Sequence, residues 1–588
     1  MATDTIDAGG EPPEWPSSDA PKHLGFQRQG RVRWLAPGTL LRTGFQAFVA
    51  HKFVELLDRR ELQETAESRV IDLTGPAGEQ AWQELWIDYV ADTGDGFDAT
   101  TTVASQLARD TITLDTAGGK VETRAGELLV LGGDQVYPTA AHRGYEDRFI
   151  GPFRAMLPWT CRPRRLVALP GNHDWYDGLT SFLRTFCQRD PGRWIGGWKT
   201  QQTRSYWAVK LPKGWWLWGI DIQLGTLIDA PQLHYFKNVP LGDDDKIILC
   251  WAKPTWTAAT DEAQSESYAV LEYFERTVIE GTNRVRLNLA GDTHHYARYE
   301  SAKPEPAQKI TAGGGGAYLS ATHHLRQPLH LPPGEEPAKQ ETFELAATYP
   351  EVGQSRRLTP GVLGLIYGNR SFPAIPAVLY ALLALPVNWL LGTLTQPDPR
   401  WWPPAAACAV LAVLLYAGLH AFAKFSSQPA RRQSMPAAVL HVVLHAAVLT
   451  GVVQLTRSVD WGLAGTPFGA GLVAGVVGAA VGPLVVGVYL YFAQFLRVNV
   501  NELFSAMAIQ DHKCFLRIHI GTDGDLTVYP IKIERTPTWT FTPPPADGAS
   551  TVDGDTMRRW FTPSHEPVAE LIEEPIPIPK VPTASPRR

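Results

Sequence analysis

The chain has 588 residues, of which 44% are hydrophobic and 19% are charged, a composition typical of globular proteins. Its formal net charge of -6 and the lack of a long basic run argue against a nucleic-acid-binding protein. The five cysteines are an odd number without Cys-x-x-Cys spacing. This favours a reducing compartment over a disulfide framework or a cysteine zinc site.

The N-terminal part predicts a polar tail followed by a helix. Residues 1–25 are rich in Gly, Pro, Ser and acids, so we expect a flexible tail, and they lack the basic start and apolar core of a signal peptide. The stretch GTLLRTGFQAFVAHKFVELLDRRELQ, residues 38–63, has apolar residues at helical spacing. It predicts an amphipathic helix that packs on the soluble domain or lies on a membrane surface.

From about residue 85 to 320, short apolar strands alternate with helical or loop segments, which predicts a layered α/β domain. Four strands end in polar residues that could bind a ligand. They are LWIDYVADTGDG at 85–96, ELLVLGGDQVYP at 127–138, RLVALPGNHDWY at 165–176 and LNLAGDTHHY at 287–296. Because ligands of open α/β sheets gather beyond the carboxyl ends of strands, we expect these four ends to form one site.

The segment from Ser371 to Arg497 is dominated by Ala, Val, Leu and Gly. It contains four apolar segments near 373–395, 403–423, 435–456 and 469–496, each long enough to cross a bilayer as a helix of about 20 residues. A transmembrane bundle over 371–497 is therefore predicted. Most Lys and Arg residues flank one end of the spans, and the positive-inside rule puts both soluble flanks in the cytoplasm.

Two patterns stand out within the predicted spans. His441 and His445 are four residues apart on one helix face, with His420 at similar depth on the neighbouring span, which indicates interhelical hydrogen bonding or a metal or haem site. Glycines with small-xxx-small spacing indicate close packing within the bundle or a homodimer through helix 469–496. These glycines are Gly471, Gly475, Gly478 and Gly482.

After the last span, KCFLRIHIGTDGDLTVYPIKIERT at 513–536 alternates apolar and polar residues around a Gly-containing turn, a strong hairpin pattern. A lone hairpin is barely stable in water. We therefore expect the hairpin to complete the soluble domain, so that this domain comprises residues 26–370 and 498–544 and the membrane bundle is an insertion. Residues 545–588 read as a Pro-rich disordered tail.

The strand-end motifs resemble the metallophosphoesterase (calcineurin-like phosphoesterase) superfamily, whose pattern runs D-x-[H/G], G-D-x-x, G-N-H-[D/E], a lone His and G-H-x-H. GNHD at 171–174 matches its block in full, and GGD at 132–134 matches the second block. DTG at 92–94 and GDQVY at 133–137 are similar to the purple acid phosphatase branch, in which a tyrosinate replaces an imidazole. The resemblance implies a four-layer α/β/β/α sandwich, here with an inserted four-helix transmembrane bundle.

The resemblance also implies site residues. The first metal ion would be held by Asp92, Asp134, Tyr137 and His294, and Asp134 would bridge to a second metal ion that also takes Asn172. His173 would be catalytic, as a general acid or as a donor at the leaving group. Two metal ions can clamp a phosphoryl group and activate water, and mixed oxygen and nitrogen ligands suit Fe, Mn or Zn. A packing role for Tyr137 remains the alternative.

Two departures from the family pattern affect the second metal ion. Alignment of KIILCWAKPTW at 246–256 on Pro254 puts Ala252 at the lone-His position, and Asp292 replaces the first His of the last block. The remaining donors, Asp134, Asn172 and Asp292, are an oxygen-rich set that suits Mn or Mg. The alternatives are a weak second site, a site completed by substrate, or a degenerate non-catalytic domain.

Further candidates have structural alternatives. Asp95 is an additional ligand or a turn carboxylate, and His295 is a ligand or a packing residue beside His294. TAGGGGAYLSATHHL at 311–325, which contains His323, is a phosphate-binding backbone loop or a plain flexible loop. Asp221 ends a strand without a motif.

These observations predict a membrane-anchored, metal-dependent phosphoesterase that hydrolyses a phosphate mono- or diester. An active site in the cytoplasm beside the bilayer makes nucleotides and lipid-linked phosphates the expected substrates, with membrane lipid as a further partner. The alternative is a degenerate ligand sensor or regulatory membrane protein. A transporter is poorly supported, because beyond the histidines the spans lack an acidic pair or a broken-helix pattern.

Overall fold

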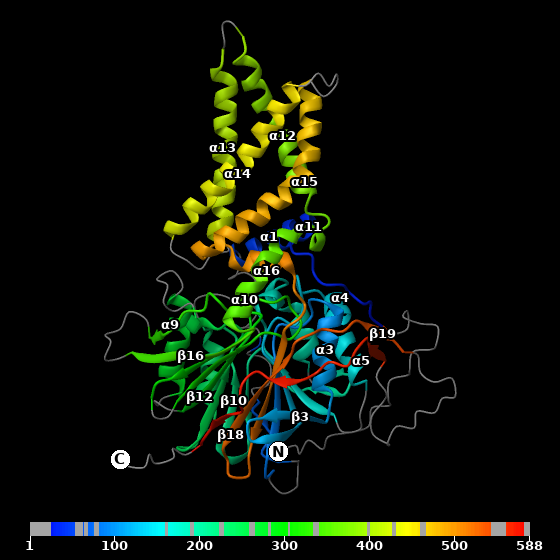
Figure 1. Cartoon of the computed structure of the whole chain (residues 1–588). Coiled ribbons are helices and arrows are strands. Elements are labelled where there is room, and N and C mark those ends of the chain that lie inside the picture. Colours follow the sequence, from blue (N-terminus) through cyan, green and yellow to red (C-terminus); the bar gives the residue numbers. More distant parts are fainter. Residues whose placement is uncertain are drawn as a thin grey trace. The chain divides into compact units, whose positions relative to one another are not determined.

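The computed structural model has two compact units that are described separately (Figure 1). One unit combines Phe45–Val352 and Gln510–Arg588 with the first residues up to Val32, and the other comprises Gly353–Ile509 with Arg33–Gly44. The described residues are 25–52, 63, 69–75, 82–158, 163–188, 193–222, 228–257, 265–279, 284–303, 306–332, 340–396, 400–425, 431–458, 466–542 and 560–580.

Two nine-stranded sheets form the centre of the first unit. The first sheet has the order β1 (Ile71–Asp72), β9 (Trp207–Lys210), β10 (Trp215–Gly219), β11 (Lys246–Cys250), β12 (Val285–Ala290), β14 (Gln308–Ala312), β13 (Tyr296–Ser301), β16 (Glu341–Tyr349), β15 (Leu329–Leu331). The second has the order β21 (Glu570–Leu571), β18 (Leu526–Ile533), β17 (Lys513–Ile520), β2 (Leu85–Val90), β5 (Leu128–Leu131), β6 (Arg164–Ala168), β8 (Trp198–Thr200), β7 (Trp194–Ile195). In the second sheet β22 (Ile576–Ile578) also pairs with β18.

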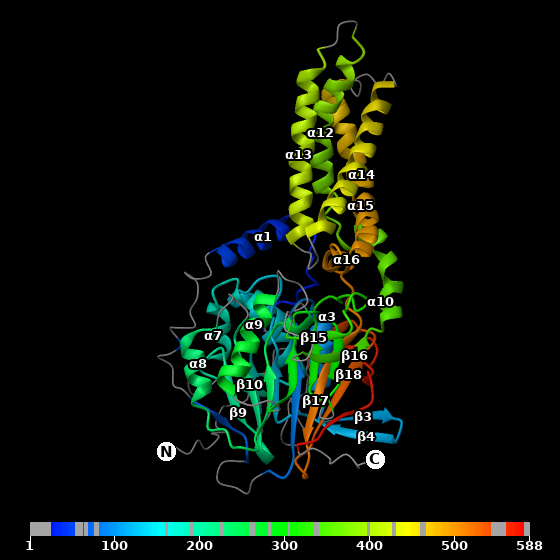
Figure 2. The same cartoon turned by 90° about the vertical axis from the view of Figure 1, so that its left-hand side faces the viewer.

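Side-chain alternation in β5 shows how the layers are built. Leu129 and Leu131 pack in a core with helices α3 (Phe97–Leu107), α5 (Gly151–Met156) and α7 (Thr180–Phe186). Leu128 and Val130 point to the opposite face and pack with residues of the first sheet. The outer face of the first sheet packs on α8 (Ala230–Lys237) and α9 (Ser265–Phe274) (Figure 2). The predicted four-layer α/β/β/α sandwich is therefore confirmed.

The central strands are parallel and buried on both faces, as their apolar sequences require. In the second sheet β2, β5 and β6 pair in parallel, and in the first sheet β10, β11, β12 and β14 do. Their carboxyl ends carry the polar motifs. This arrangement brings the ends of β2, β5, β6 and β12 to one region of the sandwich.

The hairpin that follows the apolar helices belongs to the second sheet. Strand β17 pairs with β2 in antiparallel register, with Leu516 opposite Tyr89 and Ile518 opposite Ile87. The two strands also share a buried ion pair, in which Arg517 Nε lies 3.2 Å from Asp88 Oδ1. The chain thus leaves the sandwich after β16 and returns to it more than 150 residues later, at β17.

Replacing Arg517 by Met is expected to lower the free energy of unfolding by about 3–5 kcal/mol, because Asp88 would stay buried without its partner. A matched control is Arg124→Met, since Arg124 Nη1 pairs with Glu84 Oε1 at 3.1 Å and the two side chains are 63% and 38% exposed. That change should cost about 0–1 kcal/mol. Urea unfolding of the full chain, followed by tryptophan fluorescence, measures both, and equal losses would contradict the anchoring role of Arg517.

Part of the C-terminal segment corrects the prediction of a disordered tail. Strand β20 (Phe561–Pro563) pairs with β19 (Trp539–Phe541), and β21 and β22 pair with β18. In IPI at 576–578 both isoleucines are buried and Pro577 is exposed, and an edge position tolerates the missing N–H of proline. The prediction of a disordered tail is therefore wrong for 560–580. Residues 545–559 and 581–588 lie outside the described residues.

The predicted N-terminal helix is present in its described part as α1 (Pro37–Lys52). Its predicted continuation at 53–62 and the predicted tail at 1–24 lie outside the described residues. Residues 25–32 belong to the first unit, where the Val32 amide donates to Asp95 Oδ1 at 2.6 Å.

The second unit contains four helices long and apolar enough to cross a membrane, in the segments predicted from sequence. They are α12 (Ala374–Thr393), α13 (Trp402–Phe425), α14 (Arg431–Ser458) and α15 (Pro467–Ala493). Large apolar side chains point outward, for example Val410, Val413 and Leu414 on α13, which are 58%, 64% and 61% exposed. Such apolar surfaces are expected to be covered by lipid or by another protein.

The glycine stripe of α15 packs against α12 of the same chain. A Cβ on Gly478 would lie 2.7 Å from Pro376 O, and one on Gly482 would lie 2.3 Å from Pro376 Cβ. The two alternatives for this stripe were packing within the bundle and a homodimer, and the structure shows the glycines packing within the bundle. A homodimer through helix 469–496 would have to use another face of α15, and it stays a prediction.

The histidines of α14 also contact neighbouring helices. His445 Nδ1 lies 2.8 Å from the Tyr380 hydroxyl of α12, and the His441 ring stacks on Tyr489 of α15 with ring centroids 3.9 Å apart. The His445 contact is the interhelical hydrogen bond expected from sequence. His420 stacks on Tyr416 of its own helix, with ring centroids 5.7 Å apart.

Candidate metal centre

The Tyr137 hydroxyl joins three side chains from three different strand ends. It donates to Asp92 Oδ1 at 2.8 Å and lies 3.2 Å from Asp134 Oδ2 and 3.1 Å from His294 Nε2. All four residues are buried. The structure therefore brings together the four residues predicted for the first metal ion, and the hydroxyl of Tyr137 takes part in the cluster in addition to its packing.

A second group of donors adjoins the first. With its amide oriented to satisfy both ends, Asn172 Nδ2 donates to Asp134 Oδ2 and to Asp292 Oδ1, at 3.1 Å in each case. The Asn172 oxygen then accepts from the Tyr176 hydroxyl at 3.1 Å. The backbone amide of Asp292 donates to Asp92 Oδ2 at 2.9 Å, so the loops after β2 and β12 are linked directly. The predicted donors of the second site are thus also adjacent.

The three strand-end aspartates share an unusual backbone conformation. Asp92, Asp134 and Asp292 have φ values of 60°, 50° and 65°. Asp and Asn tolerate this left-handed region better than most residues, and such strained positions cluster at functional sites. The three turns re-aim the carboxylates from the strand ends toward a common point.

Gly171 leaves space for the Asp134 carboxylate. A Cβ at position 171 would lie 2.1 Å from Asp134 Oδ1. The backbone angles of Gly171, φ -92° and ψ -177°, are open to any residue, so the restriction is one of space alone. The Gly171 amide also donates to Asp174 Oδ2 at 2.9 Å, which fixes the GNHD loop.

Gly171→Ala is expected to weaken metal binding by about 10–100-fold, because the added methyl displaces Asp134. The matched control is Gly118→Ala in the β3–β4 turn (β3, Thr111–Thr116; β4, Gly119–Arg124), where the nearest atom to a Cβ is Thr116 Oγ1 at 3.8 Å. Titration of the full chain with Mn²⁺ in a calorimeter measures both variants. Unchanged affinity in Gly171→Ala would refute this role of the glycine.

The electrostatics of the cluster favour a bound cation. Burial raises the pKa of Asp134 to about 8, and the nearby Asp292 carboxylate adds to the increase. Burial, followed by repulsion from Asp134 and Asp292, raises the pKa of Asp92 well above its ordinary value. Burial lowers the pKa of His294 well below its ordinary value, so its imidazole is neutral, as a metal ligand must be.

The donor set of the first site fits a metal ion, since two carboxylates, a phenol and an imidazole converge there. Among the described residues, no three His, Cys, Asp or Glu side chains already surround a metal position. Burial and the two carboxylates raise the pKa of Tyr137 well above 10, so the hydroxyl is protonated and donates to Asp92. A bound metal ion would replace these hydrogen bonds.

His173 lies at the side of the cluster that is partly open to solvent. Its backbone amide donates to Asp134 Oδ1 at 2.9 Å, and Nδ1–H donates to Pro138 O at 2.7 Å. That second bond fixes the ring orientation and places Nε2 at the opposite edge. Burial lowers the pKa of His173 to about 4, although the bond to Pro138 opposes the shift. A phosphate anion beside Nε2 would raise this pKa.

Position 252 lies where the alignment predicted. Ala252 is buried, and its carbonyl accepts from the Gly291 amide at 2.9 Å. A Cβ on Gly133 would lie 2.8 Å from the Cβ of Ala252. Ala252 thus adjoins the residues that precede Asp134 and Asp292, and it offers no ligand there.

The other candidates lie outside the cluster. Asp95 Oδ1 accepts from Val32 N at 2.6 Å and Oδ2 from Tyr318 N at 3.2 Å, the role of a turn carboxylate. Asp221 accepts from Ser205 Oγ at 2.6 Å. His295 is buried, and the His323 ring contacts His324.

The glycine run at 313–316 contradicts the predicted flexible loop. All four glycines are buried, and the amides of Gly313 and Gly315 donate to the carbonyls of His295 and Ala91 at 3.1 and 2.9 Å. These two amides are therefore used within the fold, and a phosphate-binding role of the loop stays a prediction. The run packs closely inside the domain, because a Cβ on Gly313 would lie 2.6 Å from Asp92 Oδ2.

Sequence reasoning missed Lys513, which is fully buried at the start of β17. Its ammonium donates to Ala317 O, and Asp95 and Asp92 attract it, while burial lowers its pKa to about 8. The only sequence signal was a lysine at the beginning of an otherwise apolar returning strand.

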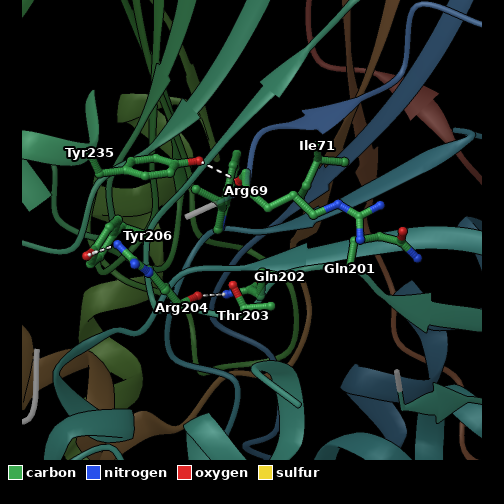
Figure 3. Close-up of a pocket in the computed structure, with 9 residues that line it drawn as sticks. Arg69, Ile71, Gln201, Gln202, Thr203, Arg204, Tyr206 and Tyr235 are labelled. Atoms are coloured by element: carbon green, nitrogen blue, oxygen red, sulfur yellow. Dashed lines mark hydrogen bonds between the residues drawn. The ribbon is translucent and has the colours of Figure 1, made fainter. Parts of the chain in front are cut away.

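A separate narrow pocket lies beside β1 and β9 (Figure 3). Its polar groups bond to one another: Arg204 Nη1 donates to Tyr206 Oη at 3.0 Å, Tyr235 Oη to Arg69 O at 3.0 Å and Gln202 Nε2 to Arg204 O at 2.8 Å. None of its lining residues belongs to the acid cluster. These contacts indicate a structural role in holding the segment after β8.

The sandwich and the cluster define an α/β metallophosphoesterase fold with a candidate metal centre at its strand ends. Residues 85–296 match the family model for calcineurin-like phosphoesterases, so this part of the chain is a calcineurin-like phosphoesterase domain, as the motifs predicted. A solved structure entitled "Structure of PhoD" aligns at 12% identity with a TM-score of 0.26. That alignment covers 42% of this chain and 60% of the other, less than two thirds of its length. No curated protein matches the sequence.

Proposed function

We propose that the protein is a membrane-anchored, metal-dependent phosphoesterase that hydrolyses a phosphate mono- or diester. The observation that carries this proposal is the convergence of Asp92, Asp134, Tyr137 and His294 within a calcineurin-like phosphoesterase domain. The four residues come from three strand ends, are buried together and are rich in negative charge. Burying such groups costs free energy, and apolar residues could fill the same space at a lower cost, so the stability of the fold does not explain their presence.

The four residues would hold a metal ion, either Fe, Mn or Zn. When bound, the ion would neutralise charge on the phosphoryl group and activate water. Asn172 and Asp292 would orient the substrate or water at the open side of the cluster. His173, held by Pro138 O, would present Nε2 to the leaving-group oxygen and donate a proton to it once the phosphate has raised its pKa.

The apolar helices support membrane anchoring, and the distribution of Lys and Arg supports a cytoplasmic position of the phosphoesterase domain. Nucleotides and lipid-linked phosphates are then the substrates that the position of the domain favours. Turnover of lipid-linked and water-soluble substrates in the same detergent would separate these two classes.

The test is hydrolysis of aryl phosphate mono- and diesters by the full-length chain in detergent with Mn²⁺, Fe²⁺ or Zn²⁺. We expect turnover that depends on the metal.

The second candidate function, a ligand sensor with a degenerate site, is favoured by Ala252 and Asp292 at two imidazole positions. Binding of phosphate without turnover of any ester would support the sensor and refute the enzyme.

A further inference from the structure

A short segment after the glycine run contacts two of the residues placed at the first metal ion. The Ala317 amide donates to the backbone carbonyl of Asp92 at 2.9 Å. The Tyr318 ring packs edge-to-face against the His294 ring, with centroids 4.5 Å apart and an angle of 88° between the planes. The Ser320 amide donates to the backbone carbonyl of His294 at 3.1 Å. Residues 317–320 therefore hold both Asp92 and His294.

Asp92 depends on such support because its backbone has an unfavourable conformation. Its φ of 60° lies in the left-handed region, which residues with a side chain rarely adopt. The Asp92 amide donates to Gly133 O at 2.9 Å, and its carbonyl accepts from Ala317. These two bonds fix the peptide groups on both sides of Asp92. The direction of its carboxylate follows from them.

Lys513 holds Ala317 from the other side. Its ammonium donates to the carbonyl of Ala317, and the lysine is fully buried. The next residue of β17, Cys514, donates its amide to Gly314 O at 3.0 Å. A Cβ on Gly314 would lie 2.5 Å from Cys514 Sγ, so the strand runs directly against the glycine run.

The burial of Lys513 is not explained by packing. A buried ammonium costs free energy, and Met would fill a similar volume without a charge. What the lysine adds is a strong donor at the carbonyl of Ala317, whose amide holds Asp92. This places Lys513 two hydrogen bonds away from the backbone of a candidate metal ligand.

We propose that Lys513 is a positioning residue of the metal centre, which through Ala317 and Tyr318 fixes the directions of the Asp92 carboxylate and the His294 imidazole. The inference rests on the proposed function for the assignment of Asp92 and His294 as ligands. Residues that hold metal ligands in place commonly change metal affinity by about 10–100-fold when they are replaced. The metal centre is then complete only when β17 has paired with β2, more than 400 residues away in sequence.

The test is calorimetric titration of the full-length chain in detergent with Mn²⁺. Lys513→Met should weaken Mn²⁺ binding by about 10–100-fold and change the electron paramagnetic resonance line shape of the bound ion. Lys513→Arg keeps the charge and the N–H donors and should restore most of the affinity. Unchanged affinity in a folded Lys513→Met variant would overturn the inference.

Lys309→Met is the matched control. Lys309 is also a buried lysine on a strand of the sandwich, but its Nζ lies over the Phe343 ring, 5.0 Å from the centroid, on the outer side of the first sheet. Both methionine variants should lower the melting temperature, and only Lys513→Met should lose Mn²⁺ affinity. Equal losses of affinity in the two variants would show a merely structural role.

A second variant tests the same segment if Lys513→Met does not fold. Tyr318→Leu removes the ring that packs against His294 and leaves the lysine in place. It should weaken Mn²⁺ binding by about tenfold, and unchanged affinity would overturn the positioning of His294.

The inference and the proposed function fail on different results. A parent chain that binds Mn²⁺ without turning over any ester, and whose Lys513→Met variant binds it weakly, would refute the enzyme and leave the role of Lys513 standing. Turnover by the parent with equal Mn²⁺ affinity in Lys513→Met would do the reverse. A parent chain that binds none of Mn²⁺, Fe²⁺ and Zn²⁺ would refute both.

Discussion

Replacing Asp134 by Asn is expected to lower kcat/KM for an aryl phosphate by about three orders of magnitude or more. The variant keeps the shape of the side chain and can still contact Tyr137 and the His173 amide, which lie 3.2 and 2.9 Å from its oxygens. It loses the negative charge with which Asp134 would hold a metal ion. The bound ion would supply several kcal/mol of charge stabilisation, and the rate falls about tenfold for each 1.4 kcal/mol lost.

The matched control is Asp95→Asn. Asp95 is also a buried carboxylate of the same loop region, but its oxygens accept from the amides of Val32 and Tyr318 and do not join the cluster. Its substitution should change kcat/KM by less than about tenfold. Metal analysis of both variants gives the cause, because only Asp134→Asn should lose the ion. Turnover in Asp134→Asn at the parent rate would show that this carboxylate is not a ligand.

His173→Asn is expected to lower kcat by about 10²–10⁴-fold while leaving the metal content unchanged. The ring nitrogen Nδ1 is held by Pro138 O, and the ring packs beside that of Tyr137 with centroids 4.5 Å apart. The loss should therefore fall on proton transfer and charge stabilisation at the leaving group. It should be larger for alkyl than for aryl esters, since a poor leaving group depends more on a proton donor.

His323→Asn serves as the control for this variant, because the His323 ring contacts His324, with ring centroids 4.2 Å apart. It should retain the parent kcat. A His173→Asn variant that loses its metal ion would show instead that the histidine is needed to form the centre. Equal losses for alkyl and aryl esters would contradict its role at the leaving group.

Much of the site follows from local sequence because parallel strands share an edge. Asp92, Asp134 and His294 each come within a few residues of the end of a buried strand, and the sheets bring those ends together. The position of Ala252 could be predicted for the same reason, since it follows β11 by two residues. The four apolar helices were predictable from length and composition alone.

Other features depend on packing between distant segments, and the sequence could not reveal them. Gly313 looks like part of a flexible run, yet its lack of a side chain is what lets the backbone approach Asp92. Ile576 and Ile578 lie in a Pro-rich segment, but their spacing of two buries both against β18 while Pro577 points outward. Lys513 faces the cluster only because β17 pairs with β2, more than 400 residues away in sequence.

The central claim is that the protein hydrolyses phosphate esters with metal bound at this cluster, and metal removal tests it most directly. The full-length chain in detergent is treated with a chelator, passed through a desalting column and assayed with an aryl phosphate during titration with Mn²⁺, Fe²⁺ or Zn²⁺. We predict that turnover is lost after chelation and returns in proportion to the metal bound. Turnover that survives complete removal of metal, or that no metal restores although the ion binds, would contradict the account.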